Sequence, residues 1–171
     1  AKCPYCDFNS HVREKVEQER WKAALLAELS WFAARLPKRR LTSIFFGGGT
    51  PSLMPPETAA ALIEAATGFW PPADEIEITL EANPTSSEAS RFHDFRRAGV
   101  NRVSLGLQAL NAEALHFLGR EHSAQEGLKA VEMAAGIFPR YSFDLIYARP
   151  HQTRAAWAKE LHEALKHAGG H

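Results

Sequence analysis

Segments with strand periodicity alternate with segments of helical periodicity along this chain, and this alternation constrains the fold more than any other feature. The strand-like segments lie at 43–46, 75–81, 102–108 and 142–147. Successive strands begin about 25–40 residues apart, which leaves room for a crossover helix between parallel strands. The sequence therefore predicts an α/β fold with a parallel sheet.

The intervening segments carry apolar residues at the three-and-four spacing of amphipathic helices. In the first of them these residues are Trp21, Leu25, Leu29, Phe32 and Leu36, and Pro37 follows directly. Helices are expected at 14–36, 56–68, 87–98, 111–118, 124–136 and 153–167.

Two of the strands have one polar face, which is unusual for a sheet that is covered by helices on both sides. The residues on these faces are Glu77, Thr79 and Glu81 in one strand and Ser104, Gly106 and Gln108 in the other. This pattern favours the wall of a barrel, with polar side chains toward a cavity and apolar side chains toward the helices. Four strands are too few to close a barrel, so we expect part of a barrel in a fragment of a longer protein.

Composition excludes several classes of function. Lys plus Arg and Asp plus Glu each number 20, so the chain has no net charge and no general attraction to nucleic acid or anionic membranes. No apolar run reaches the ~18 residues of a transmembrane segment, and no signal peptide is present. The two cysteines lie three positions apart, which argues against a disulfide framework and for a metal or redox role in the cytoplasm.

The motif Cys3-Pro4-Tyr5-Cys6 is the first candidate for chemistry. Taken alone, it fits a redox dithiol, half of a zinc site, part of an iron–sulfur site or two unlinked thiols. No second pair of cysteines supports the zinc interpretation.

Further candidates follow the predicted strands, where parallel α/β folds place their sites. Gly47-Gly48-Gly49-Thr50-Pro51 follows the first strand, and such glycines allow close approach of a ligand, although a plain loop is the simpler explanation. Glu81 and Gln108 each end a strand on its polar face. Asp144 lies within an apolar run, where a carboxylate needs partners or stays near neutral.

Together these motifs resemble the radical S-adenosylmethionine (SAM) family, in the family's order and spacing and over the whole chain. The matching segments are 3–11, 45–52, 81–85, 99–108, 118–122 and 143–147.

The resemblance implies a TIM-like (β/α)6 partial barrel in which three cysteines spaced CxxxCxxC bind a [4Fe–4S] cluster and leave one iron open for SAM. Cys3 and Cys6 match the second and third cysteines, and the first would lie two positions before Ala1. Residues 1–171 would then be an incomplete radical SAM core domain without its first strand, first cluster cysteine and C-terminal part. The SAM-binding positions of the family fall on Tyr5, Gly48, Gly49, Thr50, Glu81, Gln108, Arg120 and Asp144.

Within the family, the motifs are similar to those of the group that contains anaerobic coproporphyrinogen III oxidases and haem chaperones. The oxidases have an additional cysteine at the position of Phe8. The resemblance therefore implies a haem chaperone that uses the cluster and SAM and delivers haem to recipient haemoproteins. The alternative is an oxygen-independent coproporphyrinogen III oxidase, so whether the protein is an enzyme stays open. None of the eight histidines is singled out as a haem ligand.

Overall fold

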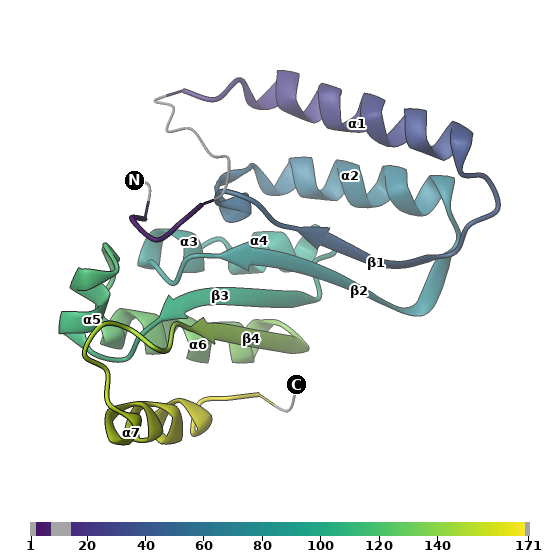
Figure 1. Cartoon of the computed structure of the whole chain (residues 1–171). Helices are drawn as coiled ribbons and strands as arrows, with labels where there is room; N and C mark the ends of the chain where they lie inside the picture. Colours follow the sequence, from purple (N-terminus) through teal and green to yellow (C-terminus); the bar gives the residue numbers. More distant parts are fainter. Residues whose placement is uncertain (1–2, 8–14, 170–171) are drawn as a thin grey trace.

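Four parallel strands form a single sheet in the computed structural model, which describes residues 3–7 and 15–169. The strands follow one another across the sheet in chain order, so each connection crosses over to a neighbouring strand (Figure 1). They are β1 (Leu41–Phe46), β2 (Pro72–Ala82), β3 (Arg102–Gln108) and β4 (Arg140–Leu145). The predicted α/β fold with a parallel, barrel-like sheet is confirmed.

The helices between the strands begin at side-chain caps in several cases. Thr85, Asn111, Ser123 and Thr153 each accept a hydrogen bond from a backbone N–H of the first turn that follows. The elements are α1 (Gln18–Arg35), the short 3-10 helix η1 (Pro51–Leu53), α2 (Pro56–Phe69), α3 (Ser86–Ala89), α4 (Phe92–Arg97), α5 (Ala112–Phe117), α6 (Ala124–Ile137) and α7 (Arg154–Leu165).

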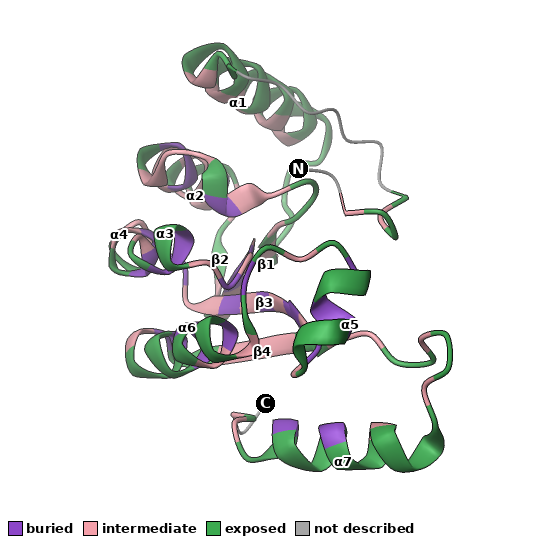
Figure 2. Ribbon diagram, turned by 90° about the vertical axis from the view of Figure 1, so that its left-hand side faces the viewer, coloured by how far each residue is buried: buried purple, intermediate pink, exposed green. Residues whose placement is uncertain are grey.

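One face of the sheet is covered by α2, α4 and α6, and the core lies in this layer (Figure 2). Leu80 in β2 and Val103 and Leu105 in β3 are fully buried there. Phe92 of α4 is also fully buried and meets Phe138 edge to face, with ring centroids 5.6 Å apart. The apolar faces of β2 and β3 therefore meet helices, as their alternation predicts.

The helix expected over 87–98 is divided in two. Ser90 and Arg91 separate α3 from α4, and Arg91 donates hydrogen bonds to the carbonyls of Ser52 at 2.8 Å and Met54 at 2.6 Å. The break thus occurs where Arg91 binds a segment almost 40 residues earlier in the chain. The spacing of apolar residues cannot predict such a distant contact.

The first helix also differs from expectation. α1 begins at Gln18 and packs on α2, but none of its residues is buried, and Trp21 and Phe32 are exposed. Its apolar spacing predicts the helix correctly without predicting burial, because α1 forms an outer layer over α2 (Figure 1). No helix among the described residues has both the length and the apolar character needed to cross a membrane.

The last helix is held by a buried ion pair. Arg149, in the loop after β4, donates to Glu160 of α7 at 2.5 Å, and both side chains are less than one tenth exposed. Glu160 also accepts from the backbone N–H of Leu110 at 2.8 Å, so α7 is joined to the loop that follows β3.

We expect replacement of Phe92 by alanine to lower the free energy of unfolding by about 3–5 kcal/mol, because it leaves a cavity in the core. Urea denaturation followed by circular dichroism measures the effect. The exposed Phe117 is the matched control, and Phe117→Ala should change stability by less than about 1 kcal/mol. Equal effects of the two substitutions would contradict this account of the core.

Candidate functional site

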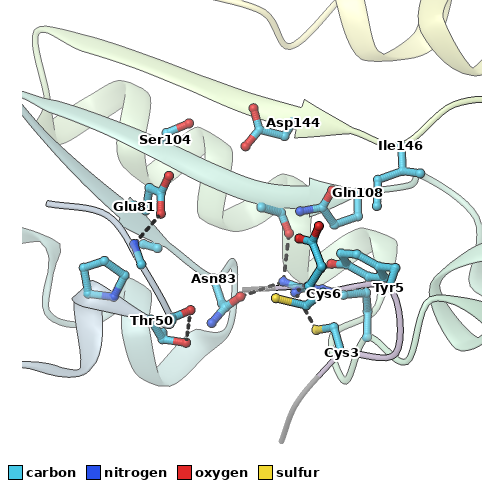
Figure 3. Close-up of a pocket in the computed structure, with 17 residues that line it drawn as sticks. Cys3, Tyr5, Cys6, Thr50, Glu81, Asn83, Ser104, Gln108, Asp144 and Ile146 are labelled. Atoms are coloured by element: carbon cyan, nitrogen blue, oxygen red, sulfur yellow. Dashed lines mark hydrogen bonds between the residues drawn. The ribbon is translucent and has the colours of Figure 1, made fainter. Parts of the chain in front are cut away.

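A cavity of about 440 Å³ lies at the C-terminal ends of β1–β4, on the polar side of the sheet (Figure 3). All ten residues that the sequence singled out line it: Cys3, Tyr5, Cys6, Gly48, Gly49, Thr50, Glu81, Gln108, Arg120 and Asp144. Asp7, Pro51, Ala82, Asn83, Ser104, Gly106 and Ile146 complete the lining. Its volume is within the range of pockets that enclose cofactor-sized ligands.

The cysteine segment approaches the sheet at a glycine. The N–H of Cys6 donates to the carbonyl of Cys3 at 3.0 Å, which closes a turn. Pro4 in this turn lies against Gly119, where an added Cβ atom would be only 2.6 Å from the proline Cδ. Gly119 also has a φ of +63°, which favours glycine. A residue with no side chain therefore lets Cys3 and Cys6 reach the cavity.

Arg120 joins the cysteine segment to the ends of two strands. Its Nη2 donates to Oδ1 of Asn83 at 2.8 Å and to the carbonyl of Gly106 at 2.9 Å. Its Nη1 lies 3.4 Å from both Sγ of Cys3 and the hydroxyl of Tyr5. Its Nε is buried and has no hydrogen-bond partner among the described residues.

The glycine loop after β1 is attached to the end of β2. The N–H of Gly48 donates to Oε2 of Glu81 at 3.3 Å, and Thr50 donates through its hydroxyl to the carbonyl of Gly49 at 2.8 Å. The second oxygen of Glu81 accepts no hydrogen bond from the described residues, so the carboxylate can accept a donor from a ligand. Backbone and carboxylate thus line this end of the cavity together.

Gln108 ends β3 in the left-handed region, with a φ of +71°. A non-glycine residue pays conformational energy there, and such positions gather at functional sites. The N–H of Ile146 donates to the carbonyl of Gln108 at 2.9 Å and supports the turn. Gly106 leaves the space that the Gln108 amide occupies, because a Cβ atom at Gly106 would lie 2.9 Å from Nε2.

Asp144 projects from β4 into the open side of the cavity and is reached by solvent there (Figure 3). The protein that surrounds its carboxyl group on the other sides nevertheless raises its pKa by desolvation, and the positive charge of Arg102 opposes this shift. Partial burial also raises the pKa of Tyr5, against the opposing effect of the Arg120 guanidinium. The carboxyl of Asp144 makes no hydrogen bond or ion pair with the described residues, so it is available to a donor from outside the protein.

Asn83 is the main cavity residue that the sequence did not single out. It follows β2 directly, at the strand end where parallel folds place polar groups, and this position was the available signal. Phe8 and His11 lie outside the described residues.

The residues of the cavity fit SAM and an iron–sulfur cluster, the two groups that the motifs imply. The positive charge of Arg120 and the acceptors at Glu81, Gln108 and Asp144 suit SAM, which has a carboxylate, an ammonium group and ribose hydroxyls. Cys3 and Cys6 are unpaired thiols on the same cavity, and thiolates are the usual ligands of iron–sulfur clusters. Within residues 3–7 and 15–169 no group of three metal-ligating side chains occurs, so these two cysteines are a partial ligand set.

Comparisons with known proteins agree with this geometry. The chain is 42% identical over 165 residues to the radical S-adenosyl methionine domain-containing protein 1, mitochondrial, of Danio rerio, which covers 96% of this chain and 37% of that protein. It is 40% identical over 167 residues to the heme chaperone HemW of Escherichia coli, which covers 96% of this chain and 44% of that protein. The chain thus spans about two fifths of the length of these relatives.

Solved structures show the same fold. The coproporphyrinogen III oxidase HemN of Escherichia coli, described as a radical SAM enzyme, matches with a TM-score of 0.83 and 26% identity over 96% of this chain and 38% of that chain. An Elp3 from Methanocaldococcus infernus has a TM-score of 0.57 at 17% identity, which shows the fold alone. The family model of the radical SAM superfamily matches residues 1–164. The chain therefore belongs to the radical SAM superfamily, a membership that implies a [4Fe–4S] cluster and SAM.

Proposed function

We propose that this chain is part of a haem chaperone that binds haem, a [4Fe–4S] cluster and SAM, and that delivers haem to haemoproteins. The observation that carries the proposal is the 40% identity to HemW over 96% of the chain, compared with 26% identity to HemN. Phe8, at the position where the oxidases have an additional cysteine, supports the same choice.

In this proposal, Cys3 and Cys6 provide two of the three cluster thiolates, and the third comes from a segment outside this chain. The chain itself is then an incomplete core domain. The bound cluster and SAM supply one-electron chemistry, and the protein orients them. The cavity size, the two thiols and the position of Arg120 in the cavity lining support this assignment.

The eight proposed SAM residues divide by the groups they offer. The loop at Gly48, Gly49 and Thr50 provides backbone and hydroxyl contacts for the amino-acid end of SAM. Glu81 and Asp144 accept hydrogen bonds from ammonium or ribose groups, whereas Arg120 meets a carboxylate. Gln108 and Tyr5 complete the set, and both side chains line the cavity (Figure 3).

The alternative function is oxygen-independent coproporphyrinogen III oxidation, in which the same cofactors serve a radical decarboxylation. The structural similarity to HemN, with a TM-score of 0.83, favours this alternative. Both functions need a tetrapyrrole as ligand, and neither requires nucleic acid, consistent with a chain of no net charge. Haemoproteins are the partners of the chaperone. A cytoplasmic location stays a prediction, since relatives from animals carry "mitochondrial" in their names.

Incubation of the full-length protein, with its cluster reconstituted anaerobically, separates the two functions. With haem, we expect uptake near one haem per chain, measured by its absorbance after gel filtration. With coproporphyrinogen III, SAM and a reductant, we expect no protoporphyrinogen. Product formation without haem uptake would refute the chaperone proposal and establish the oxidase.

The 171-residue chain alone should fail to retain a stable [4Fe–4S] cluster, because it offers two cysteines where the family uses three. Iron and sulfide analysis after anaerobic reconstitution measures this directly. An iron content of about four per chain, with the charge-transfer absorbance of a cubane cluster, would contradict the proposed ligand set.

Asp144→Asn should weaken SAM binding by the full-length protein about tenfold, since a hydrogen bond to a charged group is lost. Because the pKa of Asp144 is raised, its carboxylate is protonated at a higher pH than that of an ordinary aspartate. SAM affinity should therefore fall as the pH falls through the mildly acidic range, and Asp144→Asn should lack this part of the pH dependence.

Equilibrium dialysis with labelled SAM measures both effects. Asp74→Asn is the matched control, because Asp74 lies at the opposite, N-terminal end of β2 and is exposed. Equal SAM affinity of wild type and Asp144→Asn would remove Asp144 from the proposed set.

A further inference from the structure

We infer that Glu88, a buried carboxylate outside the cavity, is a positioning residue that orients Arg120 toward Cys3 and fixes the loop after β1. This inference rests on the proposed cluster and SAM site, but not on haem. Glu88 is only 6% exposed and lies in the four-residue helix α3, where no part of it lines the cavity.

Three hydrogen-bond donors converge on the Glu88 carboxylate. The backbone N–H of Asn83 donates to Oε2 at 2.9 Å, and the side-chain amide of Asn83 donates through Nδ2 to Oε1 at 3.1 Å. The hydroxyl of Ser52 makes a short hydrogen bond to Oε2. Since an ionised carboxylate only accepts, these contacts satisfy a group whose burial would otherwise be costly.

The contact with Asn83 decides which way its amide faces. A carboxylate can only accept, so Nδ2 of Asn83 must face Glu88, and Oδ1 is left for the opposite side. Arg120 can only donate, and its Nη2 lies 2.8 Å from this Oδ1. Glu88 therefore sets the orientation of the Asn83 amide. This amide in turn holds the Arg120 guanidinium, whose Nη1 lies 3.4 Å from Sγ of Cys3.

The contact with Ser52 acts on the other wall of the cavity. Ser52 is fully buried in η1, two residues after Thr50. Arg91 binds the same segment through the carbonyls of Ser52 and Met54. Glu88 and Arg91, three positions apart, thus hold the segment that follows the proposed SAM loop, while Glu88 alone also reaches Asn83.

Two consequences for the bound cofactors follow from this geometry. A cation held against a cluster thiolate favours the more negatively charged, reduced cluster, so the reduction potential depends on where Arg120 sits. The same contacts fix the position of the Arg120 side chain in the cavity lining, so the SAM affinity depends on them as well.

The test uses the full-length protein, with its cluster reconstituted, in four forms: wild type, Glu88→Gln, Asn83→Ala and the double variant. We expect each single substitution to weaken SAM binding about tenfold and to shift the cluster midpoint to a more negative potential. Dialysis with labelled SAM and redox titration followed by electron paramagnetic resonance measure the two quantities. The double variant should be no worse than the worse single variant, because both substitutions act through Arg120.

Asn83→Ala distinguishes the positioning of Arg120 from a general loss of structure caused by Glu88→Gln. It removes the Asn83 amide but leaves the contacts of Glu88 with Ser52 and with the backbone of residue 83 in place. Glu113→Gln is the surface control, since Glu113 is an exposed glutamate in the first turn of α5. Its SAM affinity and midpoint potential should match those of wild type.

Two outcomes would overturn the inference. One is a Glu88→Gln protein with lower thermal stability but wild-type SAM affinity and potential, which assigns Glu88 a structural role only. The other is additive losses in the double variant, which means that Glu88 and Asn83 act separately. A protein that takes up no haem but shows the expected SAM and redox changes would refute the chaperone proposal and leave the role of Glu88 standing.

Discussion

The structure of the cavity depends on the contacts of the Arg120 guanidinium. It joins Cys3, which lies 117 residues earlier in the chain, to the ends of β2 and β3. The guanidinium can do this because its several N–H donors bind the carbonyl and amide oxygens and also the cysteine sulfur, which is a weak acceptor. The bonds of Nη2 fix the plane of the group, so Nη1 and Nε have set directions.

The polar face of the sheet has its own internal charge balance away from the cavity. Arg102 and Arg140 both approach Glu77, at 3.7 Å and 3.3 Å, and Arg140 also lies 4.0 Å from Glu75. Arg102 also donates to Ser142 at 2.9 Å. Polar side chains on the concave side of a sheet need such partners where solvent is limited. The network lies toward the N-terminal ends of the strands and leaves Asp144, nearer the other end, without a direct ion pair among the described residues. One part of the polar face thus has charges that pair with one another, and the other part has polar groups that line the cavity.

The sequence was sufficient for the strands and for ten of the residues that line the cavity, because both follow from short-range patterns. Alternation in β2 and β3 separates buried Leu80 and Leu105 from the polar face, and glycines and polar residues at strand ends meet at one edge of a parallel sheet. The break at Arg91 and the part played by Asn83 were not accessible in this way. Each depends on a partner that is distant in the chain, and periodicity contains no information about such pairs.

The loops after β3 and β4 form a closed circuit around Gln108. Its carbonyl accepts from Ile146, the carbonyl of Ile146 accepts from Arg149, Arg149 pairs with Glu160, and Glu160 returns to the N–H of Leu110. The left-handed backbone at Gln108 is therefore supported by a series of contacts that includes a buried ion pair. A backbone conformation that non-glycine residues seldom adopt is in this way supported by the docking of a helix more than 45 residues further along the chain, so α7 contributes to the shape of the cavity rim without lining it.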